Sequence, residues 1–165
     1  MIQRAKTALL AAGLAVALAA PVSAQSAGAA KPDVDQLVEL VRKDVRAEKT
    51  DIISKTMALD AEQAAAFWPV YKQYEAERQA LGDERLAVIQ DLAEHFDSLN
   101  DEKAKGLLER SFAIQEKRLA LEKKYKDELL KVLPAKVVAR FFQVETRVNN
   151  LIDLGISSKI PLVYK

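Results

Sequence analysis

The sequence predicts an all-α protein built around one long antiparallel helical hairpin, with a shorter helix before the hairpin and another after it. From Phe67 to Leu99, mostly apolar residues recur at alternating steps of three and four, the period of a helix packed along its length against another. A second run with helical spacing covers 102–133, and the segment 97–101 between the runs is rich in turn-forming Asp, Ser and Asn. At ~1.5 Å per residue, helices of roughly 35 and 30 residues are about 45 to 55 Å long, so we expect an elongated hairpin.

Residues 1–24 have the pattern of a secretory signal peptide. Arg4 and Lys6 precede an uncharged run over 7–20, and 22–24 (Val-Ser-Ala) supplies the small residues of a cleavage site. The alternative is a retained membrane anchor, but about 14 apolar residues fall short of the roughly 20 that span a bilayer. We therefore expect cleavage after Ala24 and a periplasmic location.

The rest of the chain is short enough to form one domain around a single core. Residues 25–32 are small and polar and are expected to be a flexible arm, 33–154 the helical domain, and 155–165 a C-terminal tail. Apolar spacing predicts a first helix over about 34–56. Four cationic residues are expected outside its apolar face: Arg42, Lys43, Arg46 and Lys49.

A last helix is expected over about 135–154. Pro134 is suited to the start of a helix, and Gly155 is a plausible C-terminal stop. Three apolar residues of the tail are expected to dock on the hairpin or on a second subunit: Ile160, Leu162 and Val163.

The clearest helix start lies at Leu59. Asp60 can cap the free N–H groups of the first hairpin helix, and Gln63, three residues on, can reach back to the cap in a capping box. Leu59 is placed to act as the hydrophobic staple. Pro69 is expected to kink this helix, and the alternative is that one helix ends before Pro69 and another begins there.

Composition argues against several functions. The whole chain has 25 Lys and Arg against 24 Asp and Glu, and losing Arg4 and Lys6 with the leader leaves a net charge of about −1. This balance gives no basic footprint for nucleic acid. The chain has no Cys and a single His, His95, so we expect no metal site, no cofactor, no His-dependent nucleophile and no enzymatic activity. His95 is interpreted as a seam or surface residue near the turn.

Arg78 and Arg85 fall at the apolar seam of the first hairpin helix. An Arg at such a boundary can keep its stem on apolar surface if a carboxylate satisfies its guanidinium. Antiparallel pairing predicts three partners on the return helix: Glu109, Glu116 and Glu122. The alternative is that both arginines line a concave face that meets acidic or amphipathic client proteins.

Four aromatic residues precede these arginines at helical spacing: Phe67, Trp68, Tyr71 and Tyr74. Such a group is expected to be core, packed against the first and last helices. The alternative is a ligand or client pocket beside Pro69, because aromatic side chains supply large contact areas.

The box Leu59-Asp60-Ala61-Glu62-Gln63 resembles the LTxxQ motif, with Asp60 in the place of Thr, and 133–137 (LPAKV) is a second, less similar box. With these two boxes, the leader pattern and the helical hairpin, the chain resembles the Spy/CpxP-like periplasmic proteins. The segment AFWPVYKQYEAE is similar to small exported bacterial proteins labelled as regulators or sensors. The resemblance implies a helical cradle, often dimeric, that acts as an ATP-independent holdase, as an inhibitor of an envelope-stress sensor, or as a metal-responsive sensor. The last role would need His and Met residues that this chain lacks.

The leading hypothesis is therefore a non-enzymatic periplasmic chaperone or envelope-stress accessory protein, with a homodimer expected. It binds unfolded client proteins through an amphipathic helical surface, because the chain has more apolar helical surface than one hairpin can bury. The alternative is a periplasmic sensor or regulator that acts on a membrane-bound signalling protein. We expect no nucleic-acid partner and no membrane contact, since the last helix is not notably basic.

Overall fold

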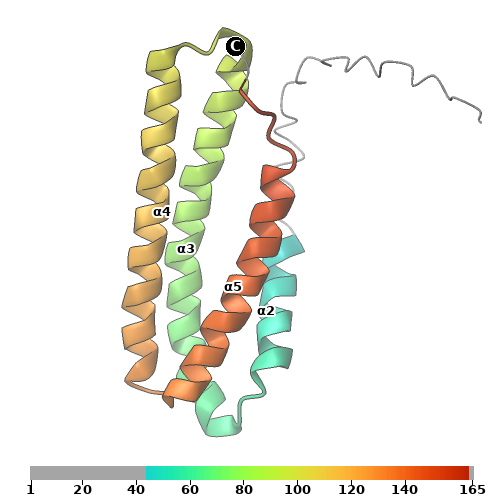
Figure 1. Cartoon of the computed structure of the whole chain (residues 1–165). Coiled ribbons are helices and arrows are strands. Elements are labelled where there is room, and N and C mark those ends of the chain that lie inside the picture. The colour runs from blue at the N-terminus through green and yellow to red at the C-terminus, as the bar shows by residue number, and fades with distance from the viewer. Residues whose placement is uncertain (1–43, 164–165) are drawn as a thin grey trace, which may run out of the picture.

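The computed structural model describes residues 44–163, with side chains from Glu48 onward. This part of the chain is all-α, as predicted, and contains four α-helices (Figure 1). They are α2 (Asp44–Met57), α3 (Ala61–His95), α4 (Asp101–Leu130) and α5 (Ala135–Ser157), with a 3-10 turn η1 (Phe96–Ser98) between α3 and α4. The predicted leader over 1–24, the arm over 25–32 and the start of the first helix lie outside the described residues.

Helices α3 and α4 form the predicted antiparallel hairpin (Figure 1). They contain 35 and 30 residues, which corresponds to about 52 and 45 Å of helix. The connection also follows the prediction, because Asn100 caps α4 by accepting a hydrogen bond from the Lys103 backbone N–H at 2.9 Å.

Helix α3 continues through Pro69 without interruption, so the alternative of two separate helices is wrong. Proline removes one backbone donor and leaves the carbonyl of the residue four positions earlier without its helical partner. Here that residue is Ala65, and both Pro69 and Ala65 are exposed. Water can satisfy the carbonyl, while buried side chains on the other side of the helix hold it in place.

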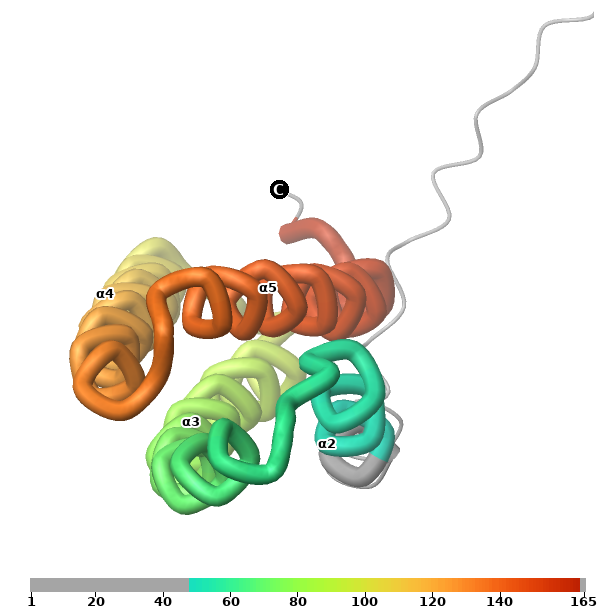
Figure 2. The backbone as a smooth tube through the Cα atoms, turned by 90° about the horizontal axis from the view of Figure 1, so that it is seen from below, coloured from blue at the N-terminus to red at the C-terminus, as the bar shows by residue number. Residues whose placement is uncertain are grey.

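Helix α5 forms a second layer over the hairpin. It runs from beside α4, across α3, to α2 (Figure 2). The predicted stop at Gly155 is wrong, because α5 extends to Ser157. Glycine costs about 1 kcal/mol in a helix, but the next residue, Ile156, is only 3 % exposed and packs against Ile89 of α3. This tertiary contact outweighs the local preference.

The main core lies at the end of the bundle where α2 passes into α3 and α4 into α5. All four helices contribute to it, and its buried residues are Ile53, Met57, Phe67, Tyr71, Tyr74, Leu121, Tyr125, Leu129, Leu133, Val137, Val138, Phe141, Val144 and Val148. A second, smaller cluster joins α3 to the end of α5 through Ile89 and Ile156. Of the tail residues, Ile160 packs on this cluster, whereas Leu162 and Val163 stay exposed. Docking of these two on the hairpin is therefore wrong for the single chain.

The connection between α2 and α3 depends on one unusual backbone conformation. Ala58 has φ +45°, in the left-handed region that non-glycine residues rarely adopt. It ends α2, and the Arg140 guanidinium of α5 donates a hydrogen bond of 2.6 Å to the Met57 carbonyl. This contact satisfies a carbonyl that the end of α2 leaves without a helical partner.

Candidate functional site

The motif residues 59–63 form the start of α3. The Asp60 carboxylate accepts a hydrogen bond of 2.8 Å from the Gln63 backbone N–H, so Asp60 is the N-cap as predicted. Within the described residues the Gln63 side chain makes no return bond to the cap, so only half of the capping box forms. Leu59 is half-buried and packs against the main core. This geometry gives the box a local role in starting the helix.

Three of the four predicted aromatic residues lie in the main core. Phe67, Tyr71 and Tyr74 are at most 4 % exposed. The Phe67 ring stacks on Tyr71 with centroids 5.4 Å apart and meets the edge of Phe141 of α5 at 5.3 Å. Trp68 is half-buried at the border of the core. The arrangement matches the core interpretation for three residues and leaves only Trp68 accessible.

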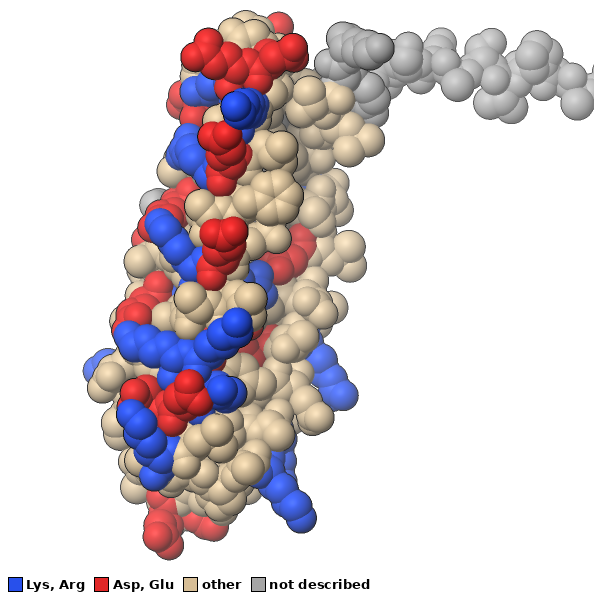
Figure 3. Space-filling view, turned by 60° about the vertical axis from the view of Figure 1, so that its left-hand side comes forward, with Lys and Arg blue, Asp and Glu red and all other residues tan. Residues whose placement is uncertain are grey.

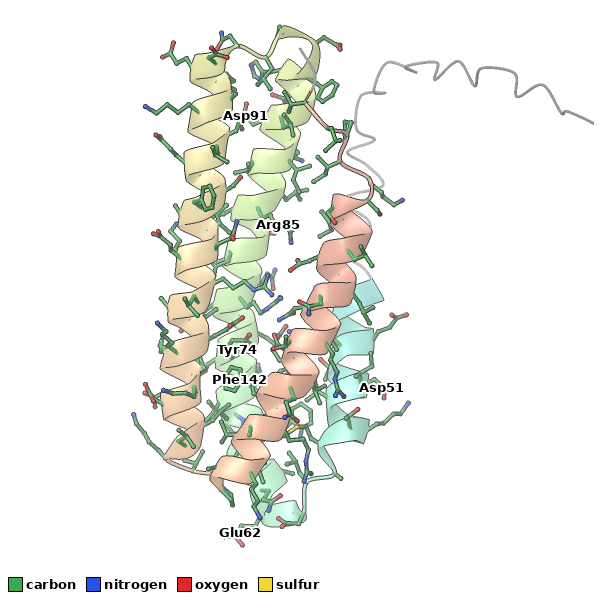
Figure 4. All side chains as sticks on the ribbon, viewed as in Figure 1. Asp51, Glu62, Tyr74, Arg85, Asp91 and Phe142 are labelled. Carbon is green, nitrogen blue, oxygen red and sulfur yellow. The ribbon has the colours of Figure 1, made fainter. Side chains whose placement is uncertain are left out.

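The two seam arginines pair with α5. Arg78 donates to the Asn149 side chain, and its Nε lies 3.2 Å from Glu145 Oε1. Arg85 bonds Asp153 at 2.5 Å, and Figure 4 shows it on the side of α3 that faces α5.

The predicted partners Glu109, Glu116 and Glu122 on α4 are therefore wrong. The reason is the second layer, because α5 lies over the face of α3 on which both arginines project. Glu122 contacts Arg118 of its own helix instead, at 3.4 Å.

Asp153 links three helices. Besides Arg85 of α3 it accepts a hydrogen bond of 2.9 Å from Arg118 of α4. Burial alone would raise the pKa of Asp153, but the bonds from Arg118 and Arg85 outweigh it and hold the pKa below its ordinary value. These contacts fasten the C-terminal part of α5 to both arms of the hairpin.

A buried polar cluster lies about one to two turns before Asp153 on α5, closer to the main core. We call it the Glu145 cluster, and it consists of Lys49, Tyr74, Glu75, Arg78, Glu145 and Asn149. Glu145 is 1 % exposed, and its Oε1 accepts hydrogen bonds from Lys49 at 2.8 Å, from Tyr74 at 2.8 Å and from Asn149 at 3.0 Å. Lys49 also bonds Glu75. One carboxylate thus ties α2, α3 and α5 together.

The electrostatics of this cluster keep Glu145 ionised. Burial would raise its pKa, but the charges of Lys49 and Arg78 and the bonds from Lys49 and Tyr74 hold it below the ordinary value. Burial and the nearby Glu145 charge raise the pKa of Tyr74, so its hydroxyl remains a donor. The other carboxylate oxygen, Oε2, is buried and has no hydrogen-bond partner among the described residues.

Sequence reasoning missed the Glu145 cluster. It placed Lys49 outside the apolar face of the first helix, whereas Lys49 is only 2 % exposed. A signal was present, because Lys49 lies four residues before Ile53 and eight before Met57, in the row that becomes the core. Glu145 and Asn149 likewise interrupt an apolar row of the last helix at a spacing of four.

A second charged group lies at the turn of the hairpin, around Asp91 (Figure 4). Lys103 and Arg110 of α4 bond its two oxygens at 2.6 and 2.7 Å, and His95 Nδ1 lies 3.1 Å from Oδ1. Asp91, His95 and Glu94 are close enough together to share a cation. The bond from Lys103 is the main cause that lowers the pKa of Asp91. Because two protein cations already occupy this carboxylate, the geometry is that of an ion-pair cluster that holds the turn.

Large apolar side chains remain exposed on α2, α4 and α5, between α4 and α5 and in the tail, as predicted from the surplus of apolar helical surface. Leu151 and Leu154 of α5 are 70 % and 65 % exposed. Others are Ile52, Leu108, Phe112, Leu119, Leu130, Val132, Leu162 and Val163. Figure 3 shows uncharged side chains beside the row of charges on one face of the molecule.

Comparisons of the chain with protein-family models, with curated proteins and with solved structures found no match. Among the described residues, no helix has the length and apolar character required to cross a bilayer.

Proposed function

We propose that the protein is an exported, non-enzymatic chaperone that holds unfolded or partly folded envelope proteins on an exposed apolar surface. We call this surface the α5–tail surface, and it consists of Leu151, Leu154, Leu162 and Val163. Its exposure is the observation that carries the proposal. Leu151 and Leu154 lie three positions apart and are therefore neighbours on α5, and Leu162 and Val163 follow in the tail. Large exposed apolar side chains on a soluble protein are typical of interaction sites when they lie together.

The chemistry of the α5–tail surface suits an unfolded chain. Leucine and valine side chains make contacts that do not depend on direction, so they accept many apolar sequences with similar affinity. Arg147 is exposed one turn before Leu151 and can attract acidic segments that flank such sequences. A client bound in this way would exchange rapidly, as a holdase without ATP requires.

The charged groups of the fold support a role without catalysis. Glu145, Asp153 and Asp91 have lowered pKa values, and each is held by cations of neighbouring helices. Groups with shifted pKa values often mark active sites, but structural ion pairs shift them too. Here the partners lie within the fold, so we assign these residues to stability.

The proposed location in the periplasm rests on the leader pattern over 1–24. The box at 59–63 and the helical hairpin support the proposal by their resemblance to Spy/CpxP-like proteins.

The test is an aggregation assay by light scattering, with a reduced disulfide protein as client. We expect the processed protein to suppress aggregation at a several-fold molar excess and the variant Leu151→Ser/Leu154→Ser to lose most of this effect. The matched control is Gln143→Ser/Asn150→Ser, which changes two exposed polar residues of the same helix. Suppression that is absent from the wild type, or equal in both variants, would contradict the proposal. Stoichiometric capture of one signalling protein would instead favour the sensor hypothesis.

A further inference from the structure

One face of α4 carries a regular stripe of side chains outside the core. Its C-terminal half borders a shallow groove that Gln115, Leu119 and Glu122 share with Thr146 of α5. The members of the stripe follow one another at alternating steps of four and three residues, the 3.5-residue period of a coiled coil. This α4 stripe consists of Asp101, Lys105, Leu108, Phe112, Gln115, Leu119, Glu122 and Lys126. All are exposed except Glu122, which is partly buried.

The α4 stripe is distinct from the side of α4 that packs in the bundle. Tyr125 represents the packed side, since its ring meets Tyr74 of α3 with centroids 5.3 Å apart. In contrast, the three apolar residues of the stripe, Leu108, Phe112 and Leu119, are 58 %, 56 % and 53 % exposed. Helix α4 lies at the edge of the molecule (Figure 2), where another helix can approach it.

We propose that the α4 stripe binds a second copy of itself in an antiparallel pair, with a two-fold axis between residues 113 and 114. In this register every charged residue meets an opposite charge on the other copy, and leucine meets leucine. The pairs are Asp101 with Lys126, Lys105 with Glu122, Leu108 with Leu119, and Phe112 with Gln115. Two-fold symmetry makes each pair twice, so the centre of the interface is apolar except for Gln115, and opposite charges lie at both ends.

Other registers of the same two helices are less favourable. A shift by one heptad in one direction places Asp101 opposite Leu119, and a shift in the other direction places Leu108 opposite Lys126. A parallel pair in register places every charge opposite a like charge. Charges at such positions determine register and orientation in coiled coils, so the antiparallel arrangement is selected.

The pair is expected to dissociate on dilution. Its apolar centre contains only Leu108, Phe112 and Leu119 from each copy, and Glu109 and Glu116 border the stripe with like charges. The inference does not depend on the proposed function, because the α5–tail surface belongs to a different helix and stays open in the dimer.

Sedimentation velocity of the processed protein, from micromolar to millimolar concentration, tests the dimer. We expect the mass to rise from monomer to dimer over this range. The variant Leu108→Asp/Leu119→Asp changes only exposed side chains and is expected to remain monomeric, while its circular dichroism is unchanged.

A charge exchange tests the register. Asp101→Lys alone places two lysines opposite each other at each end of the pair, and Lys126→Asp alone places two aspartates opposite each other. Each variant should therefore dimerise roughly five- to tenfold more weakly than the wild type. An equimolar mixture of the two variants restores both attractions, so we expect it to form a heterodimer as tight as the wild-type dimer. Lys72→Asp on α3 is the control, since it reverses an exposed charge outside the stripe and should leave the dimer unchanged.

A wild type that stays monomeric throughout, or a dimer that Leu108→Asp/Leu119→Asp leaves intact, would overturn the interface. A dimer that weakens in the single charge variants but does not recover in the mixture would overturn the antiparallel register.

Discussion

Replacing Glu145 with leucine tests the role of the buried polar cluster in the fold. The substitution removes the acceptor that Lys49, Tyr74 and Asn149 share. Lys49 keeps Glu75, and Arg78 keeps Asn149, so neither cation is left entirely without a partner. Nevertheless, a lysine that is 2 % exposed would lose one of its two carboxylates.

The expected loss follows from this geometry. Breaking a buried ion pair by removing one partner costs about 3–5 kcal/mol of the free energy of unfolding, and the remaining bond to Glu75 places Glu145→Leu near the lower end. Lys49→Met should cost less, about 1–2 kcal/mol, because Glu145 keeps Arg78, Tyr74 and Asn149. The double variant should be no less stable than Glu145→Leu alone, since it leaves fewer uncompensated charges.

Urea unfolding followed by far-ultraviolet circular dichroism measures these differences. Gln143→Leu is the matched control, because it places the same side chain at an exposed position of α5 and should change stability by less than about 0.5 kcal/mol. A loss below about 1 kcal/mol for Glu145→Leu, or a larger loss for Lys49→Met than for Glu145→Leu, would refute the assignment of Glu145 as the centre of the cluster.

Three further predictions concern pH and local backbone. Because Glu145 and Asp153 have pKa values below their ordinary 4.5 and 3.8, the stability they contribute is present above those values and is lost as the pH falls through the folded-state pKa. In urea unfolding at a series of pH values, the free energy of unfolding of Glu145→Gln should therefore fall less steeply toward acid pH than that of the wild type. Ala58→Gly should stabilise the protein by about 1 kcal/mol, because φ +45° costs glycine nothing, and Ala58→Val should destabilise it; thermal unfolding of both variants measures the two changes. Gly155→Ala should raise the thermal midpoint by an amount equivalent to about 0.5–1 kcal/mol, since an added Cβ meets no atom within 4 Å; a lowered midpoint would indicate a contact at this position.

The hairpin was predictable because its signals are local. The cap at Asp60, the turn after His95 and the cap at Asn100 each depend on residues a few positions apart. Apolar spacing then identifies the side of each helix that packs. The start of α5 after Pro134 follows in the same way, from a proline that disfavours helix before it and permits helix after it.

The candidate site was not predictable to the same extent, because its contacts are distant in sequence. A seam residue such as Arg85 indicates that another helix lies opposite, but the spacing does not identify which helix that is. The hairpin partner α4 was the natural choice, yet α5 in the second layer supplies Asp153. Similarly, a buried Lys49 makes sense only with Glu145, which lies 96 residues away.

The distribution of the core explains why apolar surface stays open on α4. Helix α5 starts beside the C-terminal end of α4 and then crosses over α3 toward α2 (Figures 1 and 2). It therefore covers α4 mainly near that end, and Arg118 reaches Asp153 from the middle of α4. Toward the turn, α4 is held by α3 and by ion pairs such as Lys103 to Asp91, without a third helix. Residues such as Phe112 therefore have no described neighbour that could bury them, although apolar residues recur along this face at the spacing of a packed helix. Apolar side chains with the spacing of a packed helix, but with no partner among the described helices, form the pattern that a second copy of α4 would complete.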